Sequence, residues 1–175
     1  MDKEYAGSLD IKQYLDLIRN EENESVLLIA VKNDNVQDVF QKSTDSKDEI
    51  SIQFLEQSGA FCFMKKWNDK GAKIYNYHNH PDTEVARPSI SDIINPPSRI
   101  VIPNDVEIPT WKETKMISVR EDFQRFVSEE FEFEDLGVVA QDSFFSMQQN
   151  TEKTIQILKE NIDLYKKNNT DLRYL

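Results

Sequence analysis

Two histidines in this chain stand two residues apart, as His78 and His80, and the chain contains no others. The run before them, KIYNY, is rich in residues that favour β structure. Side chains at positions i and i+2 of a strand point to the same face, so the two imidazoles should project side by side. A carboxylate downstream, Asp92, would complete a set of three ligands with a fourth position open, which is how a catalytic zinc is held. A closed site of the cysteine type is excluded because the chain has one cysteine, Cys62.

The residues around this pair resemble the motif of the JAMM zinc metalloprotease family, also called JAB or MPN+. The tetrapeptide HNHP followed by PSxxD is similar to RadC-like proteins, and HPD followed by a small loop and PS resembles the JAB domains of phage tail assembly peptidases. The resemblance implies that zinc is bound by His78, His80 and Asp92. It also implies that Ser89 helps to hold the tetrahedral intermediate of amide hydrolysis.

The same resemblance implies a glutamate, far upstream, that acts as general acid and base on a zinc-bound water. In the family this residue lies just before the first buried strand, after an N-terminal helix. Glu24, directly before Ser25, is the best match, with Glu22 and Glu21 as alternatives. Glu56, at the end of an expected strand, is a weaker candidate.

One spacing departs from the family pattern. The family usually has seven residues between the second histidine and the serine, whereas this chain has eight, from Pro81 to Pro88. A loop can absorb one residue by bulging outward. The alternative is that the extra residue moves Asp92 out of reach of the metal.

The N-terminal half reads as alternating helices and strands. Apolar residues at helical spacing predict a helix over 10–19, and the continuous apolar run 25–31 predicts a strand buried on both faces. A turn at 33–35 predicts a hairpin with a second strand over 36–42. Alternation predicts a third strand over 49–56, and the run 58–66 fits either a helix or a strand. The family resemblance favours a helix there, just before the strand that carries the histidines, and Cys62 within it is expected to be buried.

After Asp92 the pair Pro96-Pro97 should stop a helix within about one turn. Strands are expected over 99–102 and 116–119. From residue 121 the sequence becomes acidic and amphipathic, and 151–167 shows a capped helical stripe starting at Thr151. These patterns, with the resemblance, predict an α/β protein: a JAMM-like mixed β-sheet flanked by helices, over residues 1–120. An acidic helical C-terminal extension is expected over residues 121–175.

Composition restricts the functional classes. The chain has 175 residues, 38% of them hydrophobic, and a formal net charge of −11. Such a surface repels phosphates and disfavours nucleic-acid binding. The N-terminus lacks a secretory signal pattern and no apolar run reaches membrane-spanning length, which favours a cytoplasmic protein without a membrane partner.

Two functional hypotheses remain open at this stage. The first is a zinc-dependent JAMM-type peptidase or isopeptidase, with a protein or peptide as substrate. The second is a catalytically inactive JAMM-like module that binds a protein partner. The C-terminal helix is the expected surface for such a partner.

Overall fold

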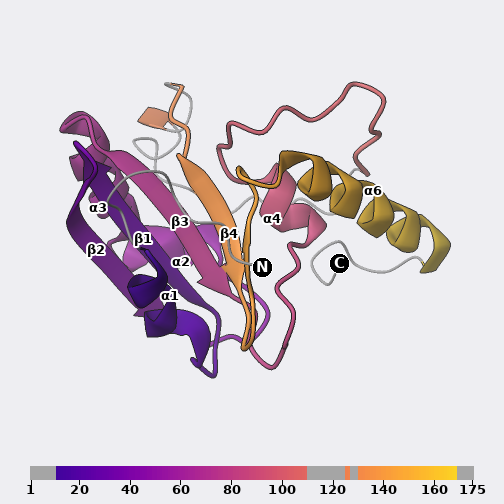
Figure 1. Cartoon of the computed structure of the whole chain (residues 1–175), viewed down its shortest axis with the longest axis horizontal. Coiled ribbons are helices and arrows are strands. Elements are labelled where there is room, and N and C mark those ends of the chain that lie inside the picture. The colour runs from indigo at the N-terminus through magenta and orange to yellow at the C-terminus, as the bar shows by residue number, and fades with distance from the viewer. Residues whose placement is uncertain (1–10, 110–124, 127–129, 169–175) are drawn as a thin grey trace.

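A computed structural model describes residues 11–109, 125–126 and 130–168 of the chain. A five-stranded sheet in the order β2-β1-β3-β4-β5 forms its centre. All neighbouring strands are antiparallel except β3 and β4, which are parallel, so the sheet is mixed. Figure 1 shows the sheet with α1 in front of it and with α4 and α6 beside β4. The α/β class expected from the sequence is therefore confirmed at this level.

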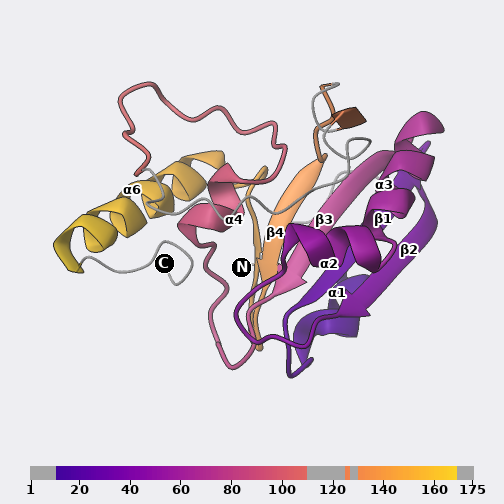
Figure 2. The same cartoon turned by 180° about the vertical axis from the view of Figure 1, so that it is seen from behind.

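Two hydrophobic clusters lie on opposite faces of the sheet. On one face α1 (Lys12–Arg19) packs Leu15 and Ile18 against alternate residues of β1, including Leu27 and Ile29. On the other face the intervening residues of that strand meet the remaining helices, which are seen from their own side in Figure 2. Every residue of β1 (Ser25–Lys32) except the last is therefore buried. This confirms the prediction of a strand covered on both faces.

The N-terminal hairpin also forms as expected. β1 pairs with β2 (Asn35–Ser43), and Asn33 and Asp34 take positive φ angles in the turn between them. Asn and Asp tolerate that conformation better than most residues, which explains the tight reversal. The N-cap considered at Ser8 lies outside the described residues.

The strand predicted over 49–56 is wrong. The segment instead forms a short helix, α2 (Ile52–Gln57), because the side chain of Ser51 accepts a hydrogen bond from the backbone N–H of Phe54 and so caps it. Phe54 and Leu55, both partly buried, then pack against the core. The alternation in this segment is too short to separate a strand from a single capped helical stretch.

The next segment forms the helix that the resemblance favoured, α3 (Ala60–Asp69). Its core face carries Phe61, Phe63 and Met64, while Cys62 is exposed. The expected burial of Cys62 is therefore wrong, because helical periodicity turns this residue away from its apolar neighbours. β3 (Lys73–Asn79) follows and lies between β1 and β4.

Beyond β3 the chain forms a one-turn helix, α4 (Ile90–Ile94), which ends before Pro96 as predicted. The strand expected over 99–102 does not form. In its place a single parallel bridge joins Ser98 to Phe133, and 99–102 runs as irregular chain. The strand expected over 116–119 lies outside the described residues.

The C-terminal part is not an all-helical extension. β4 (Asp135–Val139) and β5 (Phe144–Ser146) complete the central sheet, and β4 lies directly beside the histidine strand. The helix predicted from residue 151 is confirmed as α6 (Thr151–Asn168), and its Ile157 and Leu158 belong to the main core cluster. Thr151 begins this helix but donates its hydroxyl proton to the Gln148 carbonyl. A boundary at residue 120 would divide both the sheet and the core.

Within the described ranges, no helix combines the length and the apolar character that a membrane span requires.

Candidate metal centre

β3 presents the two histidines on one face of the sheet. His78 lies opposite Val26 in the antiparallel register with β1, and Val26 belongs to the cluster on the face covered by α3 and α4. His80 comes just after the strand, where its backbone N–H donates to the carbonyl of Val139 in β4. Two-residue periodicity therefore places both imidazoles on one face, as the sequence predicted, and in the structure they meet Asp92 of α4 there.

Asp92 reaches the histidines through the local structure of α4. Ser89 is the N-cap of this helix, and its hydroxyl oxygen accepts the backbone N–H of Asp92 at 3.1 Å. The Asp92 carboxylate in turn accepts the backbone N–H of Ser89 at 2.9 Å. This reciprocal pair is a capping box, a pattern that fixes the start of a helix. It also fixes the direction in which the Asp92 side chain points.

The three expected ligands lie close together. The Nε2 atoms of His78 and His80 are 3.1 Å apart; that of His78 lies 3.2 Å from Oδ1 of Asp92, and that of His80 lies 3.1 Å from Oδ2. Ligand atoms about 2.0–2.1 Å from a tetrahedral zinc are about 3.3 Å from one another. The separations here are close to that value, and two imidazoles with one carboxylate form a donor set that suits zinc. The residues present therefore fit the metal that the resemblance implies.

The extra residue between His80 and Ser89 does not displace Asp92. The loop is anchored to the β4–β5 turn: the backbone N–H groups of Gln141 and Asp142 donate to the carbonyls of Thr83 and Glu84. The Thr83 hydroxyl donates to the carbonyl of His80 at 2.7 Å. Asp82 takes a positive φ of 63° within this loop. The loop thus absorbs its additional residue away from the ligands.

Glu24 is the upstream carboxylate that comes near the histidines. Its side-chain oxygen and one nitrogen of each histidine lie within 4.8 Å of one another. It is buried, with 8% of its surface exposed, whereas Glu22 is exposed. Glu21 is half-buried, and Glu56 lies on α2. Among the described residues, the group that could hold a metal consists of Glu24, His78 and His80; it contains none of these three alternatives, and it does not contain Asp92, which meets the histidines through the contacts given above.

Burial controls the protonation of Glu24. Removal from water raises the pKa of its carboxyl group from 4.5 to about 7, since burial penalises the charged form. The neighbouring His78 opposes this shift, while the charges of Asp92, Asp48 and Glu49 reinforce it. A carboxyl group with a pKa near neutrality can both accept and return a proton.

His78 and Asp92 form an ion pair, with Nε2 of His78 3.2 Å from Oδ1 of Asp92. Burial alone would lower the pKa of His78, but the charge and hydrogen bond of Asp92, together with Glu24, raise it to about 9. Burial alone would raise the pKa of Asp92, but His78 and His80 hold it well below its usual range.

Three residues around the centre were missed by sequence reasoning. Asn79, between the histidines, binds the segment on either side of Glu24. The hydroxyl of Ser91 lies 3.1 Å from that of Ser89. Asn161 of α6 donates to the carbonyl of Pro88 and accepts from Arg87, so it holds the chain just before Ser89. A polar residue between the two histidines was a signal for Asn79, but the partners of Asn79 and Asn161 lie far away in the sequence.

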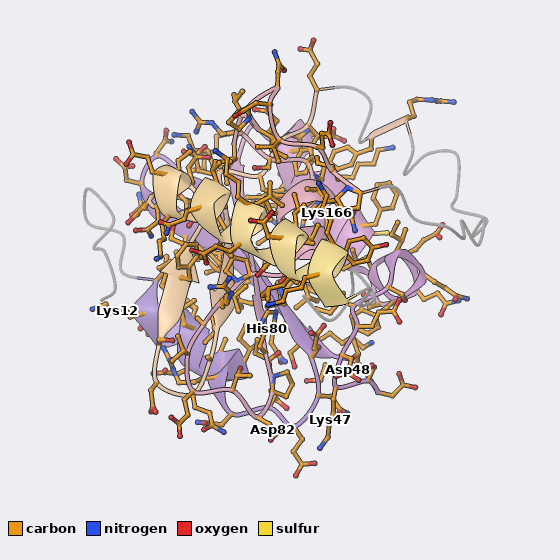
Figure 3. The ribbon with its side chains drawn as sticks, turned by 90° about the vertical axis from the view of Figure 1, so that its right-hand side faces the viewer. Lys12, Lys47, Asp48, His80, Asp82 and Lys166 are labelled. Carbon is orange, nitrogen blue, oxygen red and sulfur yellow. The ribbon has the colours of Figure 1, made fainter. Side chains whose placement is uncertain are left out.

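Charged loops lie at the edge of the molecule beyond His80 (Figure 3). Figure 3 shows Lys47, Asp48 and Asp82 at the edge of the molecule beyond His80. Lys47 and Asp82 form an ion pair of 3.6 Å between the loops that follow β2 and β3. Both side chains are mostly exposed, so this pair is screened by solvent and contributes little stability.

Comparisons with protein-family models, with curated proteins and with solved structures find no match for this chain.

Proposed function

We propose that this chain is a zinc-dependent metallopeptidase or isopeptidase of the JAMM type. The observation that carries the proposal is the convergence of His78, His80 and Asp92, with all three separations at 3.1–3.2 Å. Side chains that only stabilise a core seldom bring two imidazole nitrogens and a carboxylate to one point beside a second, buried carboxylate. The resemblance of the motif to the JAMM family supports the class of reaction.

His78, His80 and Asp92 would hold the metal, leaving one position open. Zinc bound there supplies a Lewis acid and lowers the pKa of a coordinated water toward neutrality. Asp92 is oriented by the α4 capping box, and this second set of hydrogen bonds keeps the ligand in place. No cysteine is needed for a site of this kind.

Glu24 would move the proton. Its carboxylate accepts a proton from water as the water oxygen adds to the amide carbonyl, and it returns that proton to the departing amine. The net reaction consumes one water and yields a carboxylic acid and an amine. The burial of Glu24 and its raised pKa support this role, because the group can exist in both protonation states near neutral pH.

Ser89 would stabilise the negative charge that develops on the carbonyl oxygen. Its hydroxyl oxygen already accepts the Asp92 N–H, so the hydroxyl proton is left to be donated. A donor placed where charge develops commonly contributes about 10²–10³-fold in rate. Ser91 competes for that proton in the absence of substrate.

The charges around the centre favour a neutral scissile group over a phosphate. Asp48 and Glu49 act on Glu24 with negative charge. The nearby cations Lys47 and Arg87 are already paired with Asp82 and Glu160. An amide bond carries no charge, whereas a phosphodiester would be repelled.

The test combines metal analysis with a cleavage screen. The full chain is purified without chelator, its zinc content is measured, and the zinc-loaded protein is offered a peptide library that includes lysine isopeptides. We expect one zinc per chain and hydrolysis that stops when the metal is removed. A protein that holds zinc but cleaves nothing would favour the inactive, protein-binding alternative. A protein that takes up no zinc even when it is added would overturn the metal site itself.

A further inference from the structure

Asn79 lies between the two histidines but faces the other side of the sheet. It is completely buried, with 0% of its surface exposed. Its Oδ1 atom accepts the backbone N–H of Ser25 at 2.6 Å. Its Nδ2 atom donates to the carbonyls of Glu21 and Asn23, at 3.3 and 3.1 Å. These three partners stand on both sides of Glu24 in the sequence.

The strand register explains why a side chain takes this place. The ladder between β1 and β3 ends with Val26 opposite His78. One further step would place Ser25 opposite Asn79, and a second would place Glu24 opposite His80. The regular ladder stops before these steps, although the opposite edge of the chain still bonds β4 through the N–H of His80 and the carbonyl of Val139. The carboxamide of Asn79 takes up the N–H of Ser25 just beyond the last paired residues.

Glu24 is held from the other side by backbone groups. Its N–H donates to the carbonyl of Ser46 and its carbonyl accepts from the N–H of Thr44, each at 2.8 Å. These bonds tie Glu24 to the loop after β2, which carries no proposed ligand. Asn79 ties the same segment to the strand that carries the histidines. The distance between Glu24 and the histidines therefore depends on Asn79.

We propose that Asn79 is a positioning residue whose carboxamide sets the place of the Glu24 carboxylate relative to His78 and His80. The inference deepens the proposed function and rests on it for the role of the metal. A carboxamide suits the task because it accepts from one N–H and donates to two carbonyls at once. An aspartate at this position would keep the acceptor and lose both donors, and a leucine would lose all three bonds.

The first measurement is amide hydrogen exchange in the metal-free full chain. Asn79→Leu should raise the exchange rate at Ser25 by about tenfold, the effect of losing one hydrogen bond. Asn79→Asp should keep Ser25 protected while exchange in residues 21–24 rises. Asn76→Leu on the same strand is the matched control and should leave residues 21–25 unchanged. Unchanged exchange at Ser25 in Asn79→Leu would overturn the inference. If that variant does not fold, the exchange in residues 21–24 of Asn79→Asp provides the test instead.

The second measurement is the visible absorption of bound Co²⁺, which reports the surroundings of a metal at the site. Asn79→Leu should bind one Co²⁺, because the three ligands remain, and should shift the spectrum in the same direction as Glu24→Gln. The double variant should show no additional shift, because Asn79 acts through Glu24. Additive shifts, or a spectrum that Glu24→Gln leaves unchanged, would overturn the inference.

The two measurements separate the two proposals. If the unmutated chain binds no Co²⁺, the proposed function fails, and the exchange at Ser25 alone decides whether Asn79 holds the Glu24 segment. If Co²⁺ binds and the exchange is unaffected by Asn79→Leu, the metal site stands and the positioning role fails.

Discussion

Ser89 and Asp92 cap one another at the start of α4, through hydrogen bonds of 3.1 and 2.9 Å. The Asp92 oxygen that accepts the Ser89 N–H also lies 3.1 Å from Nε2 of His80. One carboxylate therefore serves both as part of a helix cap and as a candidate metal ligand. This double use links the stability of a five-residue helix to the geometry of the metal centre.

Replacement of Ser89 separates its two roles. Ser89→Ala should retain zinc, because Asp92 still accepts the backbone N–H of residue 89, while hydrolysis falls by about 10²-fold or more. Loss of the cap should lower the free energy of unfolding by about 1 kcal/mol. Zinc titration, steady-state kinetics and denaturant unfolding measure the three effects. Ser91→Ala is the control and should change the rate much less. If Ser89→Ala loses zinc as completely as His80→Ala does, the role assigned to Ser89 is wrong.

Replacement of Glu24 tests the proton shuttle. Glu24→Gln should keep the fold and the zinc but abolish hydrolysis, since an amide cannot accept the proton. Glu22→Gln, two residues away on the surface, should have little effect. Zinc content and cleavage rate are measured for both variants. If Glu24→Gln cleaves the substrate at the normal rate, Glu24 is not the base, and Glu21, Glu22 and Glu56 are the next candidates.

The stability of the metal-free protein should fall as pH rises from about 5 to 9. The folded state raises the pKa of Glu24 from 4.5 to about 7 and that of His78 from 6.5 to about 9, so it binds protons more tightly than the unfolded chain in those windows. The stabilisation from His78 is complete below pH 6.5 and is lost as pH rises through 9. Asp92 acts in the opposite sense, because its pKa is lowered in the folded state. Its contribution to stability is lost only at acidic pH, as the pH falls below the usual pKa of a carboxyl group.

Zinc should reverse this trend, because it competes with the proton on His78 and binds more tightly as pH rises. Thermal unfolding at pH 6, 7 and 8 measures how stability changes with pH, once with chelator and once with added zinc. The gain in melting temperature on adding zinc should grow with pH. His78→Gln should abolish that gain and flatten the metal-free curve above pH 7. A metal-free protein that becomes more stable between pH 6 and 8 would contradict the assignment.

Truncation tests whether the C-terminal elements belong to the same folded unit as the site. From the sequence, a chain ending near Arg120 should keep zinc. The structure leads to the opposite expectation, because that chain lacks β4, which pairs with the histidine strand, and Asn161, which holds Pro88. Zinc binding and circular dichroism of a chain ending at Arg120 are compared with those of a chain ending at Asn168, which retains all described elements. Full zinc binding by the shorter chain would mean that β4 and α6 do not support the site.

The local features of the site were readable from the sequence. Two-residue periodicity placed His78 and His80 on one face, and the spacing from Ser89 to Asp92 is that of a capping box. Interactions between near neighbours also determine the first hairpin, the end of α4 before Pro96 and the long helix α6. Short-range physics determines all of these, so a pattern of a few residues is enough to predict them.

The secondary-structure predictions were wrong where interactions between near neighbours do not determine the structure. The segment 49–56 alternates like a strand, yet the cap at Ser51 and the space beside the core make it a helix. The segment 99–102 has strand-like residues but finds no partner beyond one bridge at Ser98. Residues 135–146 join the central sheet, although the acidic run before them suggested a helical extension.

The sequence by itself pointed to the residues of the candidate site: two imidazoles on a strand and a carboxylate downstream of them. The tertiary structure decided that these residues meet. It selected Glu24 over its neighbours by burying it beside His78 and His80, and it absorbed the extra loop residue by anchoring that loop to the β4–β5 turn. Both outcomes depend on contacts between segments more than 50 residues apart, such as Ser25 with Asn79 and Ala86 with Ser143. Periodicity carries no information about such pairs, because their energies arise only when the whole sheet has formed.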